Sequence, residues 1–270
     1  MATNIHPSAV VDPGARLGEG VTVGPFAVLG PRVEVGDRTV IDAGAQIEGP
    51  TRIGSDNRIF SYACLGFDPQ DLKFSGEETW LEVGDRNHFR EHTTVHRGTG
   101  KGGGLTKVGS DNLFMAGSHI AHDCRVGDRT IFANSGTLAG HVQVGDDAVV
   151  GAFSSVHQFC RVGNYAYIGG YSVITRDALP FVKTVGAKPA CFGVNRIGLE
   201  RKGFSAKDLK HLERAYRLLV RSKLNTSQAL ERLRDELGDV SHIQYLIQFI
   251  EESDRGVIRE VPRRGTGRGG

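Results

Sequence analysis

The sequence predicts a parallel β-helix followed by a small helical domain, and three observations predict it. An apolar residue recurs at every sixth position from Ile5 to Leu65, and the same spacing returns at Val83 and runs, after a second break, to Ile174. The residue four places after this anchor is usually small, and the period becomes helical only beyond Phe204. Neither a helix nor an ordinary alternating strand has a six-residue period. Each hexad therefore forms one short strand and one turn, and three hexads close a triangular coil.

The composition agrees with this fold and excludes several classes of protein. Glycine supplies 37 of 270 residues, about twice its usual share of roughly 7%, and we expect it at the corners of the coil, where left-handed backbone is needed. The net charge of +2 gives little drive toward nucleic acid. No apolar stretch reaches the roughly 18 residues of a membrane helix, and residues 1–10 lack the pattern of a secretory signal. We expect a cytoplasmic protein with no nucleic-acid partner and no transmembrane segment.

Breaks in the repeat predict the domain boundaries. Two segments leave the six-residue period and are expected to form surface loops, which in repeat proteins often lie on the binding face. A segment rich in Pro and Gly then connects the β-helix to three amphipathic helices, of which Ser205 caps the first. The arginine- and glycine-rich end is expected to be disordered. The predicted boundaries are a β-helix over 1–180 with loops at 66–82 and 101–107, a connection over 181–198, a helical domain over 199–254 and a tail over 255–270.

The repeat places several polar residues along one edge of the β-helix. Ile120, Leu138 and Val156 are 18 residues apart, so their hexads stack in successive coils. Neighbouring polar residues at positions that are not inward anchors then gather outside the prism, spread over about 10 Å of its axis. These residues are His119, His122, Asp123, His141, His157 and Gln158. A stacked group of this kind favours a functional site over isolated surface histidines.

The residue types at this edge suit proton transfer to or from a bound substrate. Imidazole titrates near pH 6.5, so it can take a proton from an alcohol at neutral pH. The N–H of a turn glycine such as Gly140 can stabilise an oxyanion. Cys124 and Cys160 fall at the small inward position, and no serine stands in a nucleophile elbow. Direct attack by a bound hydroxyl or amine therefore fits better than a covalent intermediate.

Two other readings of the same residues are open at this point. Histidines on a β-prism can hold zinc as three protein ligands plus water, as prism-shaped carbonic anhydrases do. However, the four cysteines show no CxxC spacing that would indicate a zinc knuckle or a disulfide framework. A purely structural solenoid explains the repeat, but it explains neither the histidine group nor the two loops.

The stretch HTTVHRGTGKGGGLTKVGSDNLFMAGSHIAHDCRVG, residues 92–127, resembles the acyl-carrier-protein-dependent UDP-N-acetylglucosamine O-acyltransferases, which catalyse the first step of lipid A synthesis. The segments QDLKFSGE (70–77), TLAGHVQVG (137–145), SSVHQFCRVG (154–163) and FGVNRIGLERKGFS (192–205) are also similar. The resemblance implies a left-handed β-helix, a homotrimer with sites between subunits and no cofactor. It implies a 3-hydroxyacyl donor on an acidic acyl carrier protein and UDP-N-acetylglucosamine as acceptor. Whether the acceptor offers a 3-hydroxyl or a 3-amino group stays open, because either would use the same base.

The resemblance also implies roles for individual residues. His122 would be the general base, Asp123 would orient it, and the Gly140 N–H would bind the oxyanion. Arg201, Lys202 and Lys207 are candidates for receiving the acidic carrier protein. Asp71 and Lys73 match positions near the sugar and the acyl hydroxyl, and Asn195, Arg201 and Lys202 match positions that contact the nucleotide. The family's substrate-binding edge is matched by His119, His141, His157 and Gln158. Lysine at position 202 weakens the match to the nucleotide site, because Lys cannot form the two-pronged contact of Arg.

Gly170 is expected to set the length of the acyl chain. It lies 48 residues beyond His122, which at 18 residues per coil is roughly 13 Å along the axis. In the family that this chain resembles, a bulky residue at this position selects short chains. The glycine therefore predicts an open groove and a long 3-hydroxyacyl donor.

Overall fold

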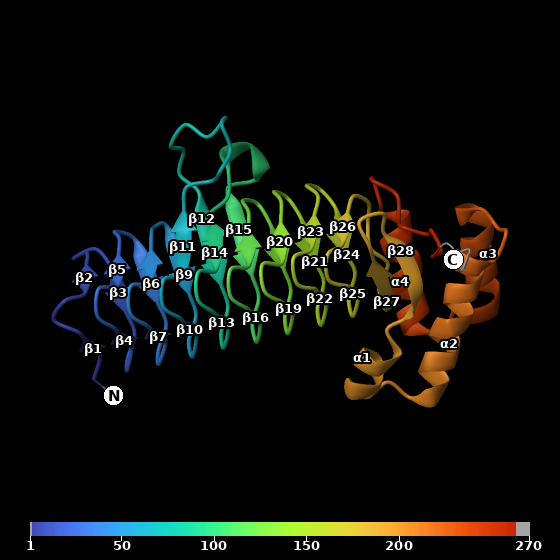
Figure 1. The fold of residues 1–270 in the computed structure, drawn as a ribbon, viewed down its shortest axis with the longest axis horizontal. Helices are drawn as coiled ribbons and strands as arrows, with labels where there is room; N and C mark the ends of the chain where they lie inside the picture. The colour runs from blue at the N-terminus through green and yellow to red at the C-terminus, as the bar shows by residue number, and fades with distance from the viewer. Residues whose placement is uncertain (1, 263–270) are drawn as a thin grey trace, which may run out of the picture.

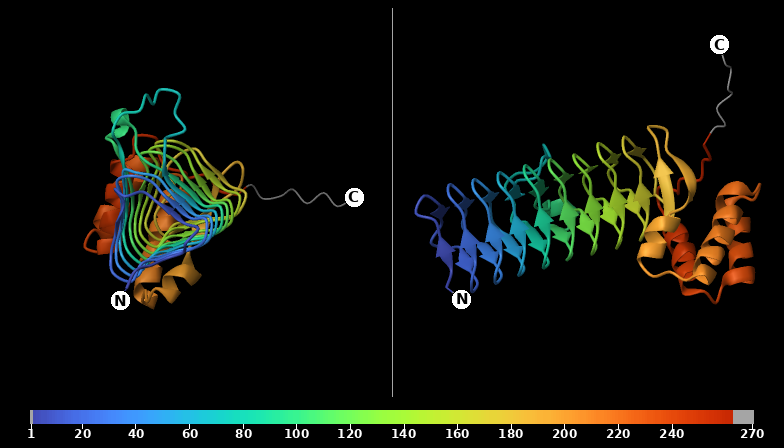
Figure 2. Two further views of the ribbon diagram at one scale, coloured as in Figure 1. Left: turned by 90° about the vertical axis from the view of Figure 1, so that its left-hand side faces the viewer. Right: turned by 60° about the horizontal axis from the view of Figure 1, so that its bottom comes forward.

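The computed structural model describes residues 2–262, which form a triangular prism that carries a helical domain at one end (Figure 1). The view along the axis shows the coils superimposed as a triangle (Figure 2). Three sheets form its faces, and every strand pair is parallel except the last. The prism is a left-handed β-helix, as the sequence predicted.

The strands of each sheet come from successive coils. Sheet A contains β1 (Asn4–Ile5), β4 (Thr22–Val23), β7 (Val40–Ile41), β10 (Arg58–Ile59), β13 (His88–Phe89), β16 (Leu113–Phe114), β19 (Ile131–Phe132), β22 (Val149–Val150), β25 (Tyr167–Ile168), β27 (Val182–Val185) and β28 (Ala190–Val194). Sheet B contains β2 (Val10–Val11), β5 (Val28–Leu29), β8 (Gln46–Ile47), β11 (Cys64–Phe67), β14 (Thr94–His96), β17 (His119–Ile120), β20 (Thr137–Leu138), β23 (Ser155–Val156) and β26 (Val173–Ile174). Sheet C contains β3 (Arg16–Leu17), β6 (Val33–Val35), β9 (Thr51–Ile53), β12 (Trp80–Val83), β15 (Leu105–Val108), β18 (Arg125–Val126), β21 (Gln143–Val144) and β24 (Arg161–Val162).

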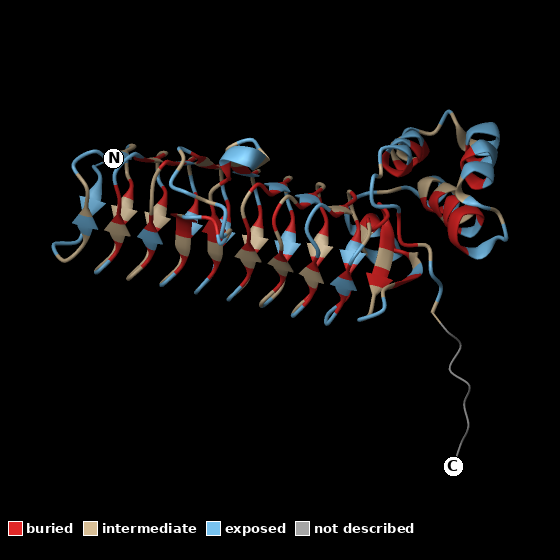
Figure 3. Cartoon of the chain, turned by 90° about the horizontal axis from the view of Figure 1, so that it is seen from above, coloured by how far each residue is buried: buried red, intermediate tan, exposed pale blue. Residues whose placement is uncertain are grey.

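The predicted anchors fill the interior of the prism. Ile120 pairs with Leu138, and Leu138 with Val156, so the 18-residue register is the one expected from sequence. Anchors of the middle coils are fully buried, and Figure 3 shows buried segments, in red, recurring along the prism beyond its first coil. The first coil is different, because no coil covers its open end: Ile5 remains 45% exposed.

The expected role of glycine is confirmed at some corners, where Gly20, Gly44 and Gly117 adopt positive φ, but glycine also has a role that we did not expect. Eighteen non-glycine residues adopt positive φ at the corners, including Asp123 at 59° and His141 at 61°. The glycines that follow the anchors instead allow adjacent coils to approach each other. A Cβ on Gly36 would lie 2.6 Å from the backbone of Gly54, closer than non-bonded atoms can come. The column of glycines is therefore required by the stacking of the coils.

The two insertions leave the prism at one edge. They connect β11 to β12 and β14 to β15, so both emerge where sheet B turns into sheet C, which we call the B–C edge. Figure 1 shows them projecting together above the prism. The first excursion, 68–79, is shorter than predicted, because strand pairing extends β11 to Phe67 and begins β12 at Trp80. The second, 97–104, lies earlier in the chain than predicted, because β14 ends at His96 and β15 begins at Leu105. A short 3-10 helix, η1 (Gly100–Gly102), lies in the second.

The connection and the helical domain are more regular than expected. The antiparallel pair β27–β28 occupies most of the connection and extends sheet A. Helix α1 begins at Arg196, before the predicted boundary, and Ser205 caps the second helix through a capping box with Asp208. The helices are α1 (Arg196–Arg201), α2 (Ala206–Tyr216) with its π-helical continuation η2 (Arg217–Arg221), α3 (Thr226–Leu237) and α4 (Ser241–Glu251).

The prediction of a disordered tail over 255–270 is wrong for its first half. Val257 and Ile258 are buried, and Val257 forms a β-bridge with Asp177. Arg259 donates hydrogen bonds to the carbonyls of Leu219 and Leu224 and to the hydroxyl of Thr226. These contacts attach the segment to the helical domain. Residues 263–270, the rest of the predicted tail, lie outside the described residues. Within residues 2–262 no helix has the length and apolar character needed to cross a bilayer.

Candidate functional site

The B–C edge brings together most of the predicted site residues. The turns after β17, β20 and β23 stack there, because their anchors are in register. These turns carry His122 and Asp123, then Gly140 and His141, then His157 and Gln158. The two insertions leave the prism at the same edge. The predicted stacking of these residues on one edge is therefore confirmed.

The geometry at the centre of this edge joins His122 to a buried carboxylate. Nδ1 of His122 lies 2.7 Å from Oδ2 of Asp123, whose side chain is 1% exposed. Since a carboxylate accepts, Nδ1 donates, and the lone pair of the neutral imidazole is on Nε2. The His122 side chain as a whole is 15% exposed. This is the arrangement of an oriented general base.

The second insertion holds the carboxylate in place. The Thr99 N–H donates to Oδ1 of Asp123 at 2.8 Å, and the Thr99 hydroxyl donates to Oδ2 at 2.7 Å. The hydroxyl of Thr106 accepts the Asp123 N–H at 2.8 Å. A Cβ on Gly102 would lie 2.1 Å from Cγ of Asp123, so only glycine fits there. Sequence analysis missed Thr99; the only signal was the glycine-rich run GKGGG, which was interpreted as a flexible loop.

Gly140 lies against the imidazole of His122. A Cβ at this position would stand 2.7 Å from Nε2 of His122. The Gly140 N–H donates to no protein acceptor among residues 2–262, although its carbonyl accepts from Phe159. A free backbone donor beside the lone-pair nitrogen of a base is the arrangement that an oxyanion requires.

His141 and His157 extend the edge away from this centre. Nε2 of His141 lies 3.7 Å from Oδ2 of Asp123, and its ring stacks on Phe159 with centroids 4.5 Å apart. His157 and Gln158 are exposed, and Nδ1 of His157 lies 3.2 Å from the Gln158 carbonyl. They are free to contact a substrate that lies along the edge.

His119 faces outward from sheet B, beside a histidine that sequence analysis missed. Its Nδ1 lies 2.7 Å from the Thr94 hydroxyl, and its ring meets that of His96 edge-on at 5.2 Å. Burial lowers the pKa of His119. Burial and the neighbouring His119 lower the pKa of His96 to about 4, so His96 is neutral at pH 7. His96 stands in the stretch HTTVH, but the hexads gave it no role.

The edge also has the composition of a metal site. His122, Asp123 and His141 each offer a ligand atom, and these atoms lie within 4.8 Å of one another. The thiols offer no competing nucleophile, because burial raises the pKa of Cys124 to about 12 and that of Cys160 to about 11. The arrangement can thus assist the attack of a bound group, and its donor set would also accept a divalent ion.

Other predicted residues lie away from this centre within one chain. Asp71 and Lys73 stand in the first insertion, where Asp71 accepts the Lys73 N–H at 3.0 Å. This loop is linked to the second one through Glu77, which accepts the Gly100 N–H at 3.1 Å. Gly170 follows β25, so it lies where sheet A turns into sheet B, the A–B edge, and not on the edge of His122. Gly170 and His122 therefore do not share an edge of one chain.

The three predicted nucleotide contacts lie near the helical domain. Asn195 precedes α1 and donates to the Tyr165 carbonyl at 3.0 Å. Nζ of Lys202 lies 2.6 Å from Oδ1 of Asp147, whose side chain is 2% exposed. Lys202 is therefore already paired, whereas Arg201 is exposed. The structure does not bring these residues to His122 of the same chain.

Comparison with known proteins finds the same architecture in well-defined relatives. Residues 177–258 match the family described as UDP N-acetylglucosamine O-acyltransferase, domain 2, and residues 141–176 match the bacterial transferase hexapeptide family. A protein of Halorhodospira halophila named acyl-[acyl-carrier-protein]–UDP-N-acetylglucosamine O-acyltransferase is 50% identical over 257 residues, which cover 95% of this chain and 100% of the relative. A relative of the same name from Myxococcus xanthus is 46% identical over 94% of this chain and 99% of its own length.

Solved structures agree with the sequence comparison. The structure of LpxA from Acinetobacter baumannii superimposes with a TM-score of 0.92 at 44% identity, covering 94% of this chain and 99% of the other. The UDP-N-acetylglucosamine O-acyltransferase of Moraxella catarrhalis gives a TM-score of 0.92 at 41% identity, with the same coverage of both chains.

Proposed function

This chain belongs to the acyl-carrier-protein-dependent UDP-N-acetylglucosamine O-acyltransferases, and we propose that His122 is the general base of its reaction. The enzyme is an acyltransferase that moves an acyl chain from acyl carrier protein to UDP-N-acetylglucosamine in lipid A synthesis. The observation that carries the proposal is the contact between His122 and the buried Asp123, at 2.7 Å, with Gly140 against the other side of the ring.

The reaction follows from the roles that this geometry allows. The 3-hydroxyl oxygen of the glucosamine attacks the thioester carbon while Nε2 of His122 takes its proton. Asp123 stabilises the imidazolium that forms, and the Gly140 N–H donates to the oxyanion. When the intermediate collapses, the carbon–sulfur bond breaks and His122 returns the proton to the leaving thiolate. The products are the ester and the free thiol of the carrier's phosphopantetheine, and the step consumes no cofactor.

We propose that the working form is a homotrimer, and the distribution of apolar side chains supports it. Exposed aromatic residues line the A–B edge and include Phe26, Tyr62, Phe153 and Tyr171, of which Tyr171 is 72% exposed. Such a ridge favours contact with another copy of the chain. A second copy would also explain how one acyl chain meets His122 and Gly170, which lie on different edges of one prism.

The remaining predicted residues complete the substrate sites in this proposal. Asp71 and Lys73 would reach the sugar and the acyl hydroxyl from the first insertion, and His119, His141, His157 and Gln158 would line the cleft. Asn195, Arg201 and Lys202 would contact the nucleotide, with Lys202 exchanging its pairing to Asp147. We place the reaction in the cytoplasm, where nucleotide sugars and acyl carrier protein are found.

An acylation assay with product masses tests this function. The enzyme is offered UDP-N-acetylglucosamine and its 3-amino analogue, each with 3-hydroxyacyl carrier proteins of increasing chain length. We expect an ester product and a preference for long chains. An amide product only would reassign the acceptor. Stoichiometric zinc or iron in the purified active protein, with activity lost on its removal, would instead favour the metal-dependent reading of the His122, Asp123 and His141 cluster.

A further inference from the structure

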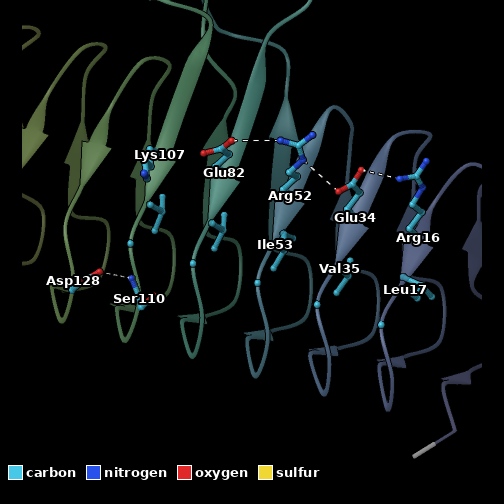
Figure 4. Close-up of a pocket in the computed structure, with 17 residues that line it drawn as sticks. Arg16, Leu17, Glu34, Val35, Arg52, Ile53, Glu82, Lys107, Ser110 and Asp128 are labelled. Atoms are coloured by element: carbon cyan, nitrogen blue, oxygen red, sulfur yellow. Dashed lines mark hydrogen bonds and ion pairs between the residues drawn. The ribbon is translucent and has the colours of Figure 1, made fainter.

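Sheet C carries a row of outward-facing side chains. Charges of opposite sign alternate in its N-terminal half, whereas two cations are adjacent in its C-terminal half. One residue of each strand contributes to what we call the outer row. It consists of Arg16, Glu34, Arg52, Glu82, Lys107, Arg125, Gln143 and Arg161, which are aligned by strand pairing. Figure 4 shows the row from Arg16 to Lys107 beside a shallow groove with an apolar and glycine floor. Sheets A and B, in contrast, expose apolar side chains such as Tyr167 and Val173.

In the N-terminal half of the outer row, the positive and negative charges balance. The Glu34 carboxylate has Oε1 3.5 Å from Nη1 of Arg16 and Oε2 3.3 Å from Nε of Arg52. Nη1 of Arg52 lies 3.7 Å from Oε1 of Glu82. Each cation there has an acidic neighbour on the next strand. This half presents no net charge to a partner, and exposed pairs of this kind add little to stability.

The C-terminal half contains two adjacent cations, Lys107 and Arg125, which we call the cationic pair. They are direct neighbours in the register of β15 and β18, both side chains are exposed, and neither forms an ion pair within residues 2–262. Glu82 borders Lys107 but its carboxylate faces Arg52, and Gln143 borders Arg125. Like charges directly opposite each other in a sheet are destabilising, so the pair costs stability unless an anion lies across it.

The cationic pair lies beside the proposed base. Arg125 follows His122 by three positions, so their Cα atoms are at most about 11 Å apart. Gly102 packs on Asp123, which places the exposed Lys101 of the second insertion at the same edge. A partner on sheet C could therefore deliver a flexible thioester arm to Nε2 of His122 from close range.

We propose that the cationic pair, with Lys101, is the docking surface for the acidic acyl carrier protein that brings the donor. This inference rests on the proposed function, because it assigns a surface to the donor's carrier. It differs from the expectation that Arg201, Lys202 and Lys207 receive the carrier; Lys202 is already paired with Asp147. Charge complementarity at an exposed surface chiefly steers association, so the surface should act on capture of the carrier and not on the acyl-transfer step.

Charge reversal, compared between two donors, tests the proposal. Lys107→Glu and Arg125→Glu are assayed with a 3-hydroxyacyl carrier protein and with the 3-hydroxyacyl thioester of pantetheine, which has no protein. We expect KM for the carrier-linked donor to rise by about tenfold, equivalent to 1.4 kcal/mol, with kcat/KM for the pantetheine thioester unchanged. In the wild type, KM for the carrier-linked donor should rise with salt concentration, because salt screens the attraction between the carrier and the cationic pair. In the variants this rise should be smaller, because less attraction is left to screen.

Two matched variants separate this surface from general charge effects. Arg16→Glu makes the same change of charge on the same sheet, five strands away, and should leave both donors unaffected. Lys207→Glu tests the helical domain. The proposal is overturned if Arg125→Glu impairs both donors equally, if Arg16→Glu has the same effect, or if only Lys207→Glu raises KM for the carrier. A wild-type enzyme that uses no carrier-linked donor would instead contradict the proposed function itself, and the docking surface with it.

Binding measured without turnover provides an independent readout. Titration of the unacylated carrier into wild-type and Arg125→Glu enzyme should show a weaker Kd for the variant. Its melting temperature should not be lower than that of the wild type, because the carboxylate lies opposite Lys107 and removes a like-charge pair. Equal Kd values would overturn the proposal even if the kinetic constants differed.

Discussion

The backbone of Gly140 lies against the imidazole of His122 so closely that a Cβ would stand 2.5 Å from Cε1 of the ring. The glycine therefore serves two purposes. It leaves room for the imidazole, and within residues 2–262 its N–H, which lies beside Nε2 of the proposed base, donates to no acceptor.

Gly140→Ala should therefore lower kcat without unfolding the protein. Alanine keeps the backbone N–H, but its methyl group would push the ring of His122 out of position, and a displacement of about 1 Å in a reacting group can cost about 10²-fold in rate. Steady-state kinetics and a melting curve measure the two effects. Gly136→Ala, on a turn of the same coil without contact to His122, is the control. Wild-type kcat in Gly140→Ala would disprove the steric role of the glycine.

Thr99 is a positioning residue, and removing its hydroxyl should affect the base indirectly. Thr99→Val keeps the shape of the side chain but loses the 2.7 Å hydrogen bond to Oδ2 of Asp123. A hydrogen bond to a charged group contributes about 1.5–3 kcal/mol, so we expect kcat to fall by roughly tenfold or more. The acidic limb of the pH–rate profile should move as well.

Thr99→Ser restores the hydroxyl and is the matched control. It should recover most of kcat and return the pH–rate profile to that of the wild type. An unchanged profile in Thr99→Val, despite reduced stability, would mean that Thr99 only anchors the loop.

His96 should make the fold sensitive to mild acid. Its pKa is lowered to about 4 in the folded state by burial, whereas an unfolded histidine titrates near 6.5. The unfolded state therefore binds more protons between these values, and stability falls as the pH drops from about 6.5 toward 4. We expect the melting temperature to decrease by at least about 3 °C between pH 7.5 and pH 5.

The variant His96→Gln should show a smaller decrease over the same pH range, because glutamine does not titrate. The comparison uses the slope against pH, so a general loss of stability in the variant does not affect it. A slope equal to that of the wild type would assign the acid sensitivity to other groups, such as His119, whose pKa is also lowered by burial.

Gly170→Met should shift the acyl preference toward shorter donors. Gly170 is exposed, and a Cβ there would contact the Ala152 backbone, at 3.3 Å from its O and 3.9 Å from its N, so the turn must adjust by only a few tenths of an ångström. A longer side chain would fill the groove and penalise only chains that reach it. The ratio of kcat/KM for long and short donors measures the effect. Equal losses for both donors would mean that the substitution damages the turn.

The repeat carried the fold prediction because one physical constraint sets every coil. Inward anchors such as Leu138 must be apolar, and an 18-residue closure fixes which hexads stack, so the edge shared by His122, His141 and His157 could be located from spacing alone. The backbone conformation at the corners could not be predicted from spacing. Positive φ at Asp123 and His141 arises from the closure of each corner, and tertiary contacts override their local preference.

Several of the features that sequence analysis missed lie outside the repeat. Thr99 reaches Asp123 across 24 residues of sequence, and the path of a loop is not given by hexad periodicity. Arg259 is held by backbone carbonyls of the helical domain, which leave no trace in composition. The arginine and glycine content of the tail described its chemistry, but it did not reveal these contacts.

The most direct test of the central claim is the turnover of His122→Ala with the carrier-linked donor. The side chain lies outside the prism, so the melting temperature should stay close to that of the wild type. Positioned base catalysis contributes about 10²- to 10⁴-fold, and we expect kcat to fall within that range. If the folded variant keeps more than about a tenth of the wild-type kcat, His122 is not the general base.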